Sequence, residues 1–274
     1  IKILEREVPK RPKALLAKAL LGRAYDRSGL DLKSGVIWKE LAGGWDAGTF
    51  DKTRGDHAYL TALGGLGERD WKYASEAFEE TLKLDPKLHR ANVDWGWLFM
   101  TKYAVPDAEK SFKDVLKYDP NHADAWAGLA WVEWYDAQPN KQRGKQHAEK
   151  ALSINPSCVE AMLYLAALDV YDSEFGRALI WLDRALKVNP GSIRAMGFQG
   201  AVHFMREKTA DYEAAKKRAL AVNPRGAEFF QIVGKAADRH HLYREAVALL
   251  KEAKNLDANS SDVLGALGIA LLRV

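Results

Sequence analysis

The sequence lacks the residues and runs on which several classes of protein depend. A single cysteine, Cys158, excludes an internal disulfide framework. No stretch approaches the roughly 18 consecutive apolar residues of a membrane span. The seven histidines form no His-Glu-x-x-His motif, and the chain has neither a Gly-rich phosphate loop nor a Cys-x-x-Cys pair. We therefore predict no catalytic residue, no metal site and no cofactor.

Net charge is low as well, at +4 for the whole chain. Residues 1–54 hold 12 Lys and Arg against 7 Asp and Glu, whereas the remaining residues hold 29 against 30. A helical-repeat protein that binds nucleic acid needs a basic stripe to neutralise phosphates. The balanced charge beyond residue 54 argues against such a partner, and we expect none.

Proline, by contrast, recurs at a nearly constant interval. Successive prolines of one series are separated by 34, 36, 34 and 34 residues, and each follows an acid or an amide. A further step reaches Asp257-Ala258, where the proline is absent but the acid remains. Self-similarity at this period is typical of solenoid proteins. The series is Pro86, Pro120, Pro156, Pro190 and Pro224.

Small residues recur in phase with the prolines and predict two helices in each unit. One series marks the middle of the first helix: Gly22, Ala62, Gly96, Ala130, Ala166, Gly200, Gly234 and Gly268. Twelve residues later most units have an alanine, and four residues after it a large apolar residue, as in Ala74 with Phe78 and Ala108 with Phe112. Small residues let two helices approach, and large ones fill the space between them. Proline then ends the second helix.

These units resemble the tetratricopeptide repeat, a helix–turn–helix of about 34 residues. The unit from Gly55 carries Ala62, Trp71, Ala74, Phe78 and Pro86 at the positions of that family's pattern. The resemblance implies an all-α fold, a right-handed solenoid or superhelix of tandem helix pairs. It also implies a non-catalytic scaffold that binds a protein or a peptide.

The period divides the chain into four parts. We predict a basic N-terminal arm or linker in residues 1–13, and a degenerate first repeat with a polar loop in residues 14–54. Six units follow in residues 55–258, and a truncated seventh in residues 259–274. The chain stops within this unit and lacks a polar cap. We therefore expect that four leucines have no partner helix there and that this face can self-associate: Leu264, Leu267, Leu271 and Leu272.

The resemblance also implies a binding groove, because the family's concave face is lined by fixed positions of the first helix of each unit. On this chain those positions are aromatic and apolar in the middle and charged toward the C-terminus, from Glu228 to Arg239. Contiguous apolar surface with Trp, Tyr and Met marks interaction sites. The predicted groove residues are Arg90, Val93, Trp97, Met100, Trp131, Trp134, Tyr135, Leu163, Val170, Tyr171, Arg194, Phe204 and Met205.

One activity common in the family does not carry over. Members that bind the acidic tails of heat-shock chaperones use Lys, Asn and Arg as a carboxylate clamp, and this chain has Val93, Trp97 and Trp131 among those positions. Packing between neighbouring helices is the alternative explanation for these tryptophans. The sequence does not choose between an extended and a helical ligand.

Two further interpretations stay open. Residues 212–224 with 229–250 resemble the repeats of bacterial proteins that carry a peptidase-MA-like metallohydrolase domain, so the chain could be the arm of a larger hydrolase. That resemblance implies a bacterial cytoplasm or periplasm without choosing between them. An RNA-binding helical-repeat protein is the third alternative, and the acids Asp124 and Glu160 in the predicted groove count against it.

Overall fold

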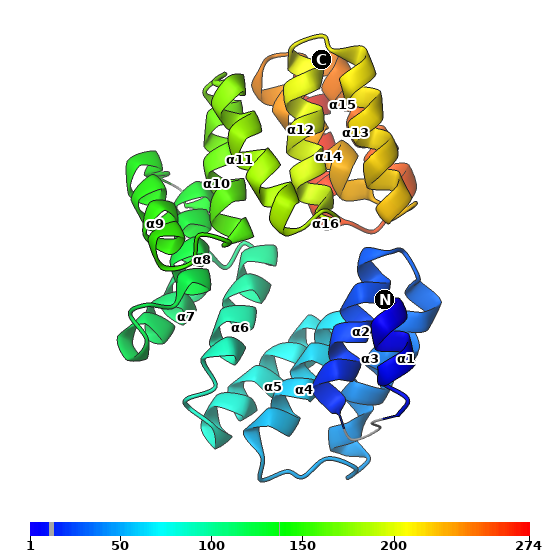
Figure 1. The fold of residues 1–274 in the computed structure, drawn as a ribbon, viewed down its shortest axis with the longest axis vertical. Helices are drawn as coiled ribbons and strands as arrows, with labels where there is room; N and C mark the ends of the chain where they lie inside the picture. The colour runs from blue at the N-terminus through cyan, green and yellow to red at the C-terminus, as the bar shows by residue number, and fades with distance from the viewer. Residues whose placement is uncertain (11–13, 137) are drawn as a thin grey trace. The chain divides into compact units, whose positions relative to one another are not determined.

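The computed structural model describes residues 1–10, 14–136 and 138–274, and the regular secondary structure of this part of the chain is entirely helical, with no strand (Figure 1). From α4 to α15 the helices alternate between 13 and 14 residues in length. We call the first helix of each pair helix A and the second helix B. The helices are α1 (Lys2–Glu7), α2 (Leu15–Arg27), α3 (Asp31–Asp46), α4 (Gly55–Gly67), α5 (Trp71–Leu84), α6 (His89–Thr101), α7 (Val105–Tyr118), α8 (Ala123–Tyr135), α9 (Lys141–Ile154), α10 (Val159–Tyr171), α11 (Phe175–Val188), α12 (Ile193–Met205), α13 (Thr209–Val222), α14 (Ala227–Arg239), α15 (Tyr243–Leu256) and α16 (Ser261–Leu271).

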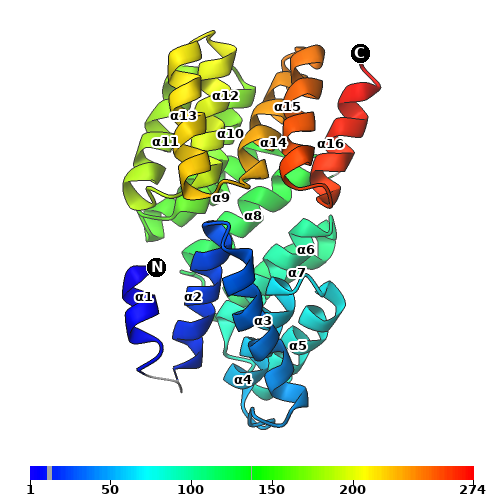
Figure 2. The same ribbon diagram turned by 90° about the vertical axis from the view of Figure 1, so that its right-hand side faces the viewer.

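The helices form two compact units, residues 1–140 and 141–274. Within each unit most consecutive helices lie side by side, as both views of the ribbon show, whereas α14 packs mainly on α12 and α15 (Figures 1 and 2). The boundary falls after Pro139-Asn140, where the repeat is two residues longer than elsewhere. The boundary between the two units therefore coincides with the longer repeat.

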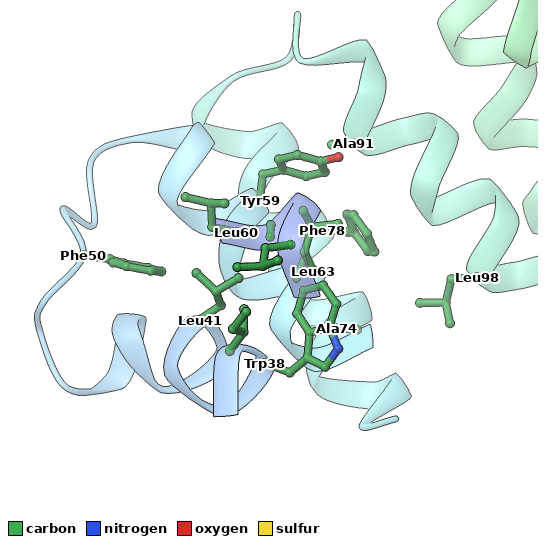
Figure 3. Close-up of a cluster of buried hydrophobic side chains, with 14 of the residues drawn as sticks. Trp38, Leu41, Phe50, Tyr59, Leu60, Leu63, Ala74, Phe78, Ala91 and Leu98 are labelled. Atoms are coloured by element: carbon green, nitrogen blue, oxygen red, sulfur yellow. The ribbon is translucent and has the colours of Figure 1, made fainter. Parts of the chain in front are cut away.

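Each unit buries its own apolar residues, and the N-terminal unit contains a large aromatic cluster (Figure 3). Trp38 of α3 and Phe78 of α5 meet the side chains of α4 there, and both are almost fully buried. The alanines that the sequence marks in the B helices are fully buried as well. The large apolar residue four positions later is buried with them, as at Phe112, Leu182 and Leu250. The two-helix pattern predicted from the sequence is thus confirmed.

The acid or amide before each proline has a structural reason. Its side-chain oxygen accepts a hydrogen bond from the backbone N–H two residues later, which is an Asx turn across the end of helix B. In one unit Asp85 Oδ1 accepts from Lys87 N at 3.0 Å, and in another Asn223 Oδ1 accepts from Arg225 N at 2.8 Å. The same bond forms at Asp119, Asn155, Asn189 and Asp257. The bond at Asp257, where Ala258 replaces proline, shows that the turn does not depend on the proline.

The turn between helix A and helix B contains a residue in the left-handed region. In the first repeat this residue is Gly29, with φ of 67°. In five later repeats it is not glycine, although φ lies between 55° and 64°: Arg69, Tyr103, Ser173, Glu207 and His241. A side chain in this conformation costs about 1 kcal/mol or more, because Cβ approaches the carbonyl oxygen. These turns are therefore a repeated source of backbone strain.

Replacing Ser173 or Glu207 by glycine should stabilise the protein by about 0.5–1 kcal/mol each, since glycine adopts this conformation without a steric penalty. Urea unfolding followed by circular dichroism measures the change. The reciprocal variant Gly29→Ala should lose a similar amount. Equal stability of Ser173→Gly and the unmodified protein would show that the turn carries no strain.

The small residues in helix A are packing residues, as the sequence predicts. A Cβ added to Gly96 would lie 2.7 Å from the Phe112 ring, and one added to Gly234 would lie 2.8 Å from Leu250 Cγ. Gly200 differs, because its nearest neighbour is Phe229 of α14, at 2.6 Å from the added Cβ. In that repeat close packing therefore involves the A helix of the next repeat.

Two expectations about the chain ends need correction. We expected an extended arm in residues 1–13, but residues 2–7 form α1, and Glu5 accepts hydrogen bonds from Tyr25 Oη at 2.9 Å and Lys33 Nζ at 3.1 Å. Residues 11–13 lie outside the described part of the chain. At the other end, Leu267 is buried because α16 packs on α14 and α15. Leu264, Leu271 and Leu272 are exposed.

Candidate interaction surface

The predicted groove residues lie on A helices, which contact one another within each unit. In the N-terminal unit α2 contacts α4 and α6 contacts α8, and in the C-terminal unit α10, α12, α14 and α16 make contact in sequence. The structure places five of the predicted residues in the interior, where they contribute to packing and offer little surface. These are Val93, Met100, Trp131, Leu163 and Val170.

The other predicted residues keep part of their surface in solvent. Tyr135 is 39% exposed. Arg90 is exposed too. The remaining six are half-buried, so they present an edge or a face while the rest of the side chain packs: Trp97, Trp134, Tyr171, Arg194, Phe204 and Met205. The predicted residues thus lie on A helices, but the sequence pattern does not separate the buried ones from those that reach solvent.

Four aromatic side chains gather in the N-terminal unit, and we call them the aromatic ledge: Tyr103, Trp131, Trp134 and Tyr135. The ring centroids of Trp131 lie 5.9 Å from Trp134 and 6.4 Å from Tyr135, and the Tyr103 and Tyr135 rings meet edge to face at 6.1 Å. Trp131 is only 3% exposed, and its buried ring packs against the rings of Trp134 and Tyr135. Aromatic pairs at these separations attract each other beyond their burial.

Sequence reasoning missed Tyr103, which is the most exposed member of the ledge at 55%. Its backbone φ is 55°, a conformation that is unusual for a bulky residue. The repeat period could have placed Tyr103 at an A–B turn, because it lies 34 residues after Arg69 at the equivalent position.

A polar network joins three A helices of the N-terminal unit. Asp94 of α6 accepts hydrogen bonds from Tyr59 Oη at 2.6 Å and from Arg23 Nη2 at 3.1 Å. Arg90 Nε in turn donates to Tyr59 Oη at 3.1 Å. Burial, together with the neighbouring Asp94 carboxylate, raises the pKa of Tyr59. The predicted groove residue Arg90 is therefore part of an internal network that holds α4 and α6 together.

The charged residues of the C-terminal unit also pair with one another. Arg194 lies 2.7 Å from Glu160 and 3.5 Å from Glu228, so one guanidinium links α10, α12 and α14. All three occupy the same repeat position, 34 residues apart. Lys235 lies 3.5 Å from Asp262 in the same way. The charge that the sequence places at this end is thus compensated within the unit.

Aromatic residues of the C-terminal unit pack around Tyr212, which replaces the usual alanine of helix B. Its ring lies 5.6 Å from Phe204 and 5.9 Å from Phe229. Burial raises the pKa of Tyr212 to about 12, so the phenol stays neutral. Phe204 itself is half-buried near the end of α12.

The described residues offer no group of three or more His, Cys, Asp or Glu that could hold a metal ion. His240 and His241 contact different groups: His240 Nε2 lies 3.1 Å from the Val170 carbonyl oxygen and His241 Nδ1 2.6 Å from Tyr243 Oη. Cys158 is buried. Within the described ranges, no helix has the length and apolar character needed to cross a membrane.

Comparison with known proteins identifies the fold. No protein-family model and no curated protein matches the sequence. Among solved structures, a tetratricopeptide repeat protein from Parabacteroides merdae aligns over 92% of this chain and 97% of its own length, with 16% identity and a TM-score of 0.59. The type IV pilus biogenesis factor PilW aligns over 78% of this chain and 98% of its own, with 18% identity and a TM-score of 0.53. The anaphase-promoting complex assembly Cut9–Hcn1 aligns over 96% of this chain and 56% of its own, with 12% identity and a TM-score of 0.63.

Proposed function

We propose that this chain, which has the tetratricopeptide-repeat fold, is a non-catalytic scaffold that binds a protein or peptide through aromatic side chains on its A helices. The observation that carries the proposal is the aromatic ledge. Tyr103 and Tyr135 expose large rings above a buried tryptophan. Trp and Tyr are the residues most enriched at the energetic centres of protein interfaces.

The pairing of the basic residues on the A helices supports an apolar ligand. Arg90 and Arg194 already make hydrogen bonds or ion pairs with residues of their own unit. A ligand that relied on them would have to replace those bonds at the cost of leaving the original partners unpaired. Burial of apolar surface therefore supplies the binding free energy, and a nucleic-acid ligand is not favoured.

The C-terminal unit has half-buried apolar side chains of its own on its A helices, namely Tyr171, Phe204 and Met205. Arg239 stacks on Tyr171, with its guanidinium carbon 5.4 Å from the ring centroid. This stacking holds the ring in place.

The ledge can be tested without knowing the natural partner. Peptides selected from a random displayed library against the intact protein should be rich in apolar and aromatic residues. Their affinity, measured by fluorescence anisotropy, should fall by roughly tenfold to a hundredfold in the Trp134→Ala, Tyr135→Ala double variant, because hot-spot side chains contribute about 1.4–2.8 kcal/mol. Trp131 is left intact because its removal would open a cavity.

The matched control is Tyr118→Ala, since Tyr118 is an exposed tyrosine of a B helix, away from the ledge. This variant should keep the affinity of the unmodified protein. Peptides that bind the double variant equally well, with its circular dichroism unchanged, would refute the ledge as the binding surface.

The alternative, in which the repeats form one arm of a bacterial metallohydrolase, requires a catalytic motif outside these 274 residues. A zinc-binding His-Glu-x-x-His motif would have to occur elsewhere in the same gene product. The sequence of the complete gene decides this directly. In that case the ledge would position a substrate or the catalytic domain.

A further inference from the structure

The B helices differ in charge, although the repeats as a whole are nearly balanced. Helices α9, α11 and α13 together hold 10 Lys and Arg against 4 Asp and Glu, whereas α5 and α7 hold 5 against 6. All three basic helices belong to the C-terminal unit. This unit therefore has a local excess of positive charge on its B helices, which the net charge of the chain does not reveal.

One position of helix B accounts for much of this difference. It lies nine residues after the first residue of the helix, and in three successive repeats it holds an exposed basic residue. We call these residues the basic row: Lys150, Arg184 and Arg218. In the repeats on either side the same position is acidic, as Glu80, Asp114 and Glu252. Equivalent positions lie on the same side of stacked repeats, so the basic side chains follow one another from α9 to α13.

The acids at this position in the N-terminal unit have partners on their own helix. Lys83 Nζ lies 4.0 Å from Glu80, and Lys117 Nζ lies 2.6 Å from Asp114. Both lysines follow three residues after the acid, where side chains on a helix meet. No member of the basic row has an acid three or four positions away in either direction. Across the described residues, none of them forms an ion pair.

The acids next to the row in sequence are engaged elsewhere. Glu149 lies 3.8 Å from Lys145, and Asp183 accepts a hydrogen bond from Gln199 Nε2 of α12 at 2.9 Å. In α13 the preceding residue is itself basic, Lys217. The positive charge of the row is therefore not compensated within the unit, unlike the charge on the A helices.

Uncharged side chains flank the row. On α11, Ile180 and Val188 lie one turn before and one turn after Arg184, and they are 62% and 45% exposed. The guanidinium carbon of Arg184 lies 4.7 Å from the Trp181 ring centroid, which holds the arginine in place. A ligand along this surface would meet positive charge and apolar surface side by side.

We propose that the basic row binds an acidic segment of a second protein, which crosses α9, α11 and α13 with carboxylates at the row and apolar side chains against Ile180 and Val188. Arginine and lysine clusters recognise acidic motifs in this way. The row lies on B helices of the C-terminal unit, whereas the aromatic ledge lies in the N-terminal unit. The inference therefore goes beyond the proposed function and gives the scaffold a second binding surface.

Two other anionic partners fit the surface less well. An anionic bilayer would bring its headgroups against the exposed acids Glu149, Asp211 and Glu213 of the same helices, whereas a single polypeptide segment can avoid them. A single-stranded nucleic acid needs exposed rings on which its bases stack, and the Trp181 ring beside the row is already stacked with Arg184.

The test uses the whole chain and a defined probe, a fluorescein-labelled peptide of about twelve residues with the repeated sequence Glu-Leu-Glu-Ser, about 40 Å long when extended. The row variant is Lys150→Glu, Arg184→Glu, Arg218→Glu. Its helices should fold, because other repeats have an acid at this position, and circular dichroism checks this. Fluorescence anisotropy should show at least tenfold weaker binding of the peptide by the row variant. Binding by the unmodified protein should weaken as salt is added, since the charges are exposed.

The matched control changes net charge by the same amount on other B helices. It is Lys72→Glu, Lys110→Glu, Lys251→Glu, in which all three lysines are exposed. This variant should bind the peptide with nearly the affinity of the unmodified protein. The alanine triple at the row should also lose affinity, by less than the glutamate triple, which separates lost attraction from added repulsion.

Three results would overturn the proposal. They are no saturable binding of the peptide by the unmodified protein, an equal loss in the row and control variants, and tighter binding to phosphatidylserine vesicles or to oligothymidylate than to the acidic peptide. The Trp134→Ala, Tyr135→Ala variant should bind the acidic peptide as the unmodified protein does. Failure of the aromatic ledge and failure of the basic row are therefore distinguishable.

Discussion

Replacing Gly64 by alanine is expected to destabilise the N-terminal unit by about 3 kcal/mol or more, at or above the upper end of overpacking effects. The added Cβ would lie 2.3 Å from the backbone nitrogen of Ala42 and 2.8 Å from its Cα. These are backbone atoms of α3, so no side-chain rotation relieves the contact. The helices α3 and α4 would have to move apart, which would disturb the cluster around Trp38 and Leu41.

A nearby glycine provides the matched control. Gly43 lies in α3, and a Cβ added there has no neighbour within 4 Å. Gly43→Ala should therefore stabilise the protein by about 0.5–1 kcal/mol, the usual gain from alanine over glycine in a helix. Urea unfolding of both variants measures the contrast. If Gly64→Ala were as stable as Gly43→Ala, the close approach of α3 and α4 would be wrong.

Removal of the Phe112 ring is expected to cost about 3–5 kcal/mol, as for other buried aromatic residues replaced by alanine. Phe112 is fully buried. A Cβ added to Gly96 of α6 would lie 2.7 Å from its ring, and one added to Gly128 of α8 would lie 2.4 Å from it. The ring therefore fills a space that two glycines on different helices create, and alanine would leave a cavity between three helices.

The fit between this ring and the glycines predicts non-additive effects. Gly128→Ala alone should destabilise by overpacking, and Phe112→Leu alone should destabilise by loss of contact. Combined, they should cost less than the sum, because the smaller side chain leaves room for the added methyl. The control Ile180→Ala removes an exposed side chain and should change stability by less than about 0.5 kcal/mol. Strict additivity would contradict the assigned contact.

The repeated fold could be predicted from the sequence because each repeat packs its two helices through the same short-range contacts. Small residues at Gly96 and Gly234, and large ones at Phe112 and Leu250, carry information about packing over fewer than 20 residues. The acid or amide before proline likewise encodes its turn over three residues. Local interactions of this kind recur with the period, so their register identifies helix pairs without knowledge of the tertiary structure.

The sequence did not predict which of the proposed groove residues reach solvent, because exposure depends on neighbours from other repeats. Trp131 and Trp134 are three residues apart on the same helix, yet only Trp131 is fully covered. Tyr103 belongs to the same surface through the backbone conformation of its turn. Neither fact is encoded in the spacing of one repeat.

The sequence by itself determined the helical-repeat class, the position of each helix pair and the residues that let helices approach, since these depend on short-range packing and turn chemistry. Tertiary structure alone decided which aromatic rings reach solvent and which charges are already paired, as with Arg194 between Glu160 and Glu228. The physical reason is that burial and ion pairing are set by residues 34 or more positions away, brought together only when the helices stack.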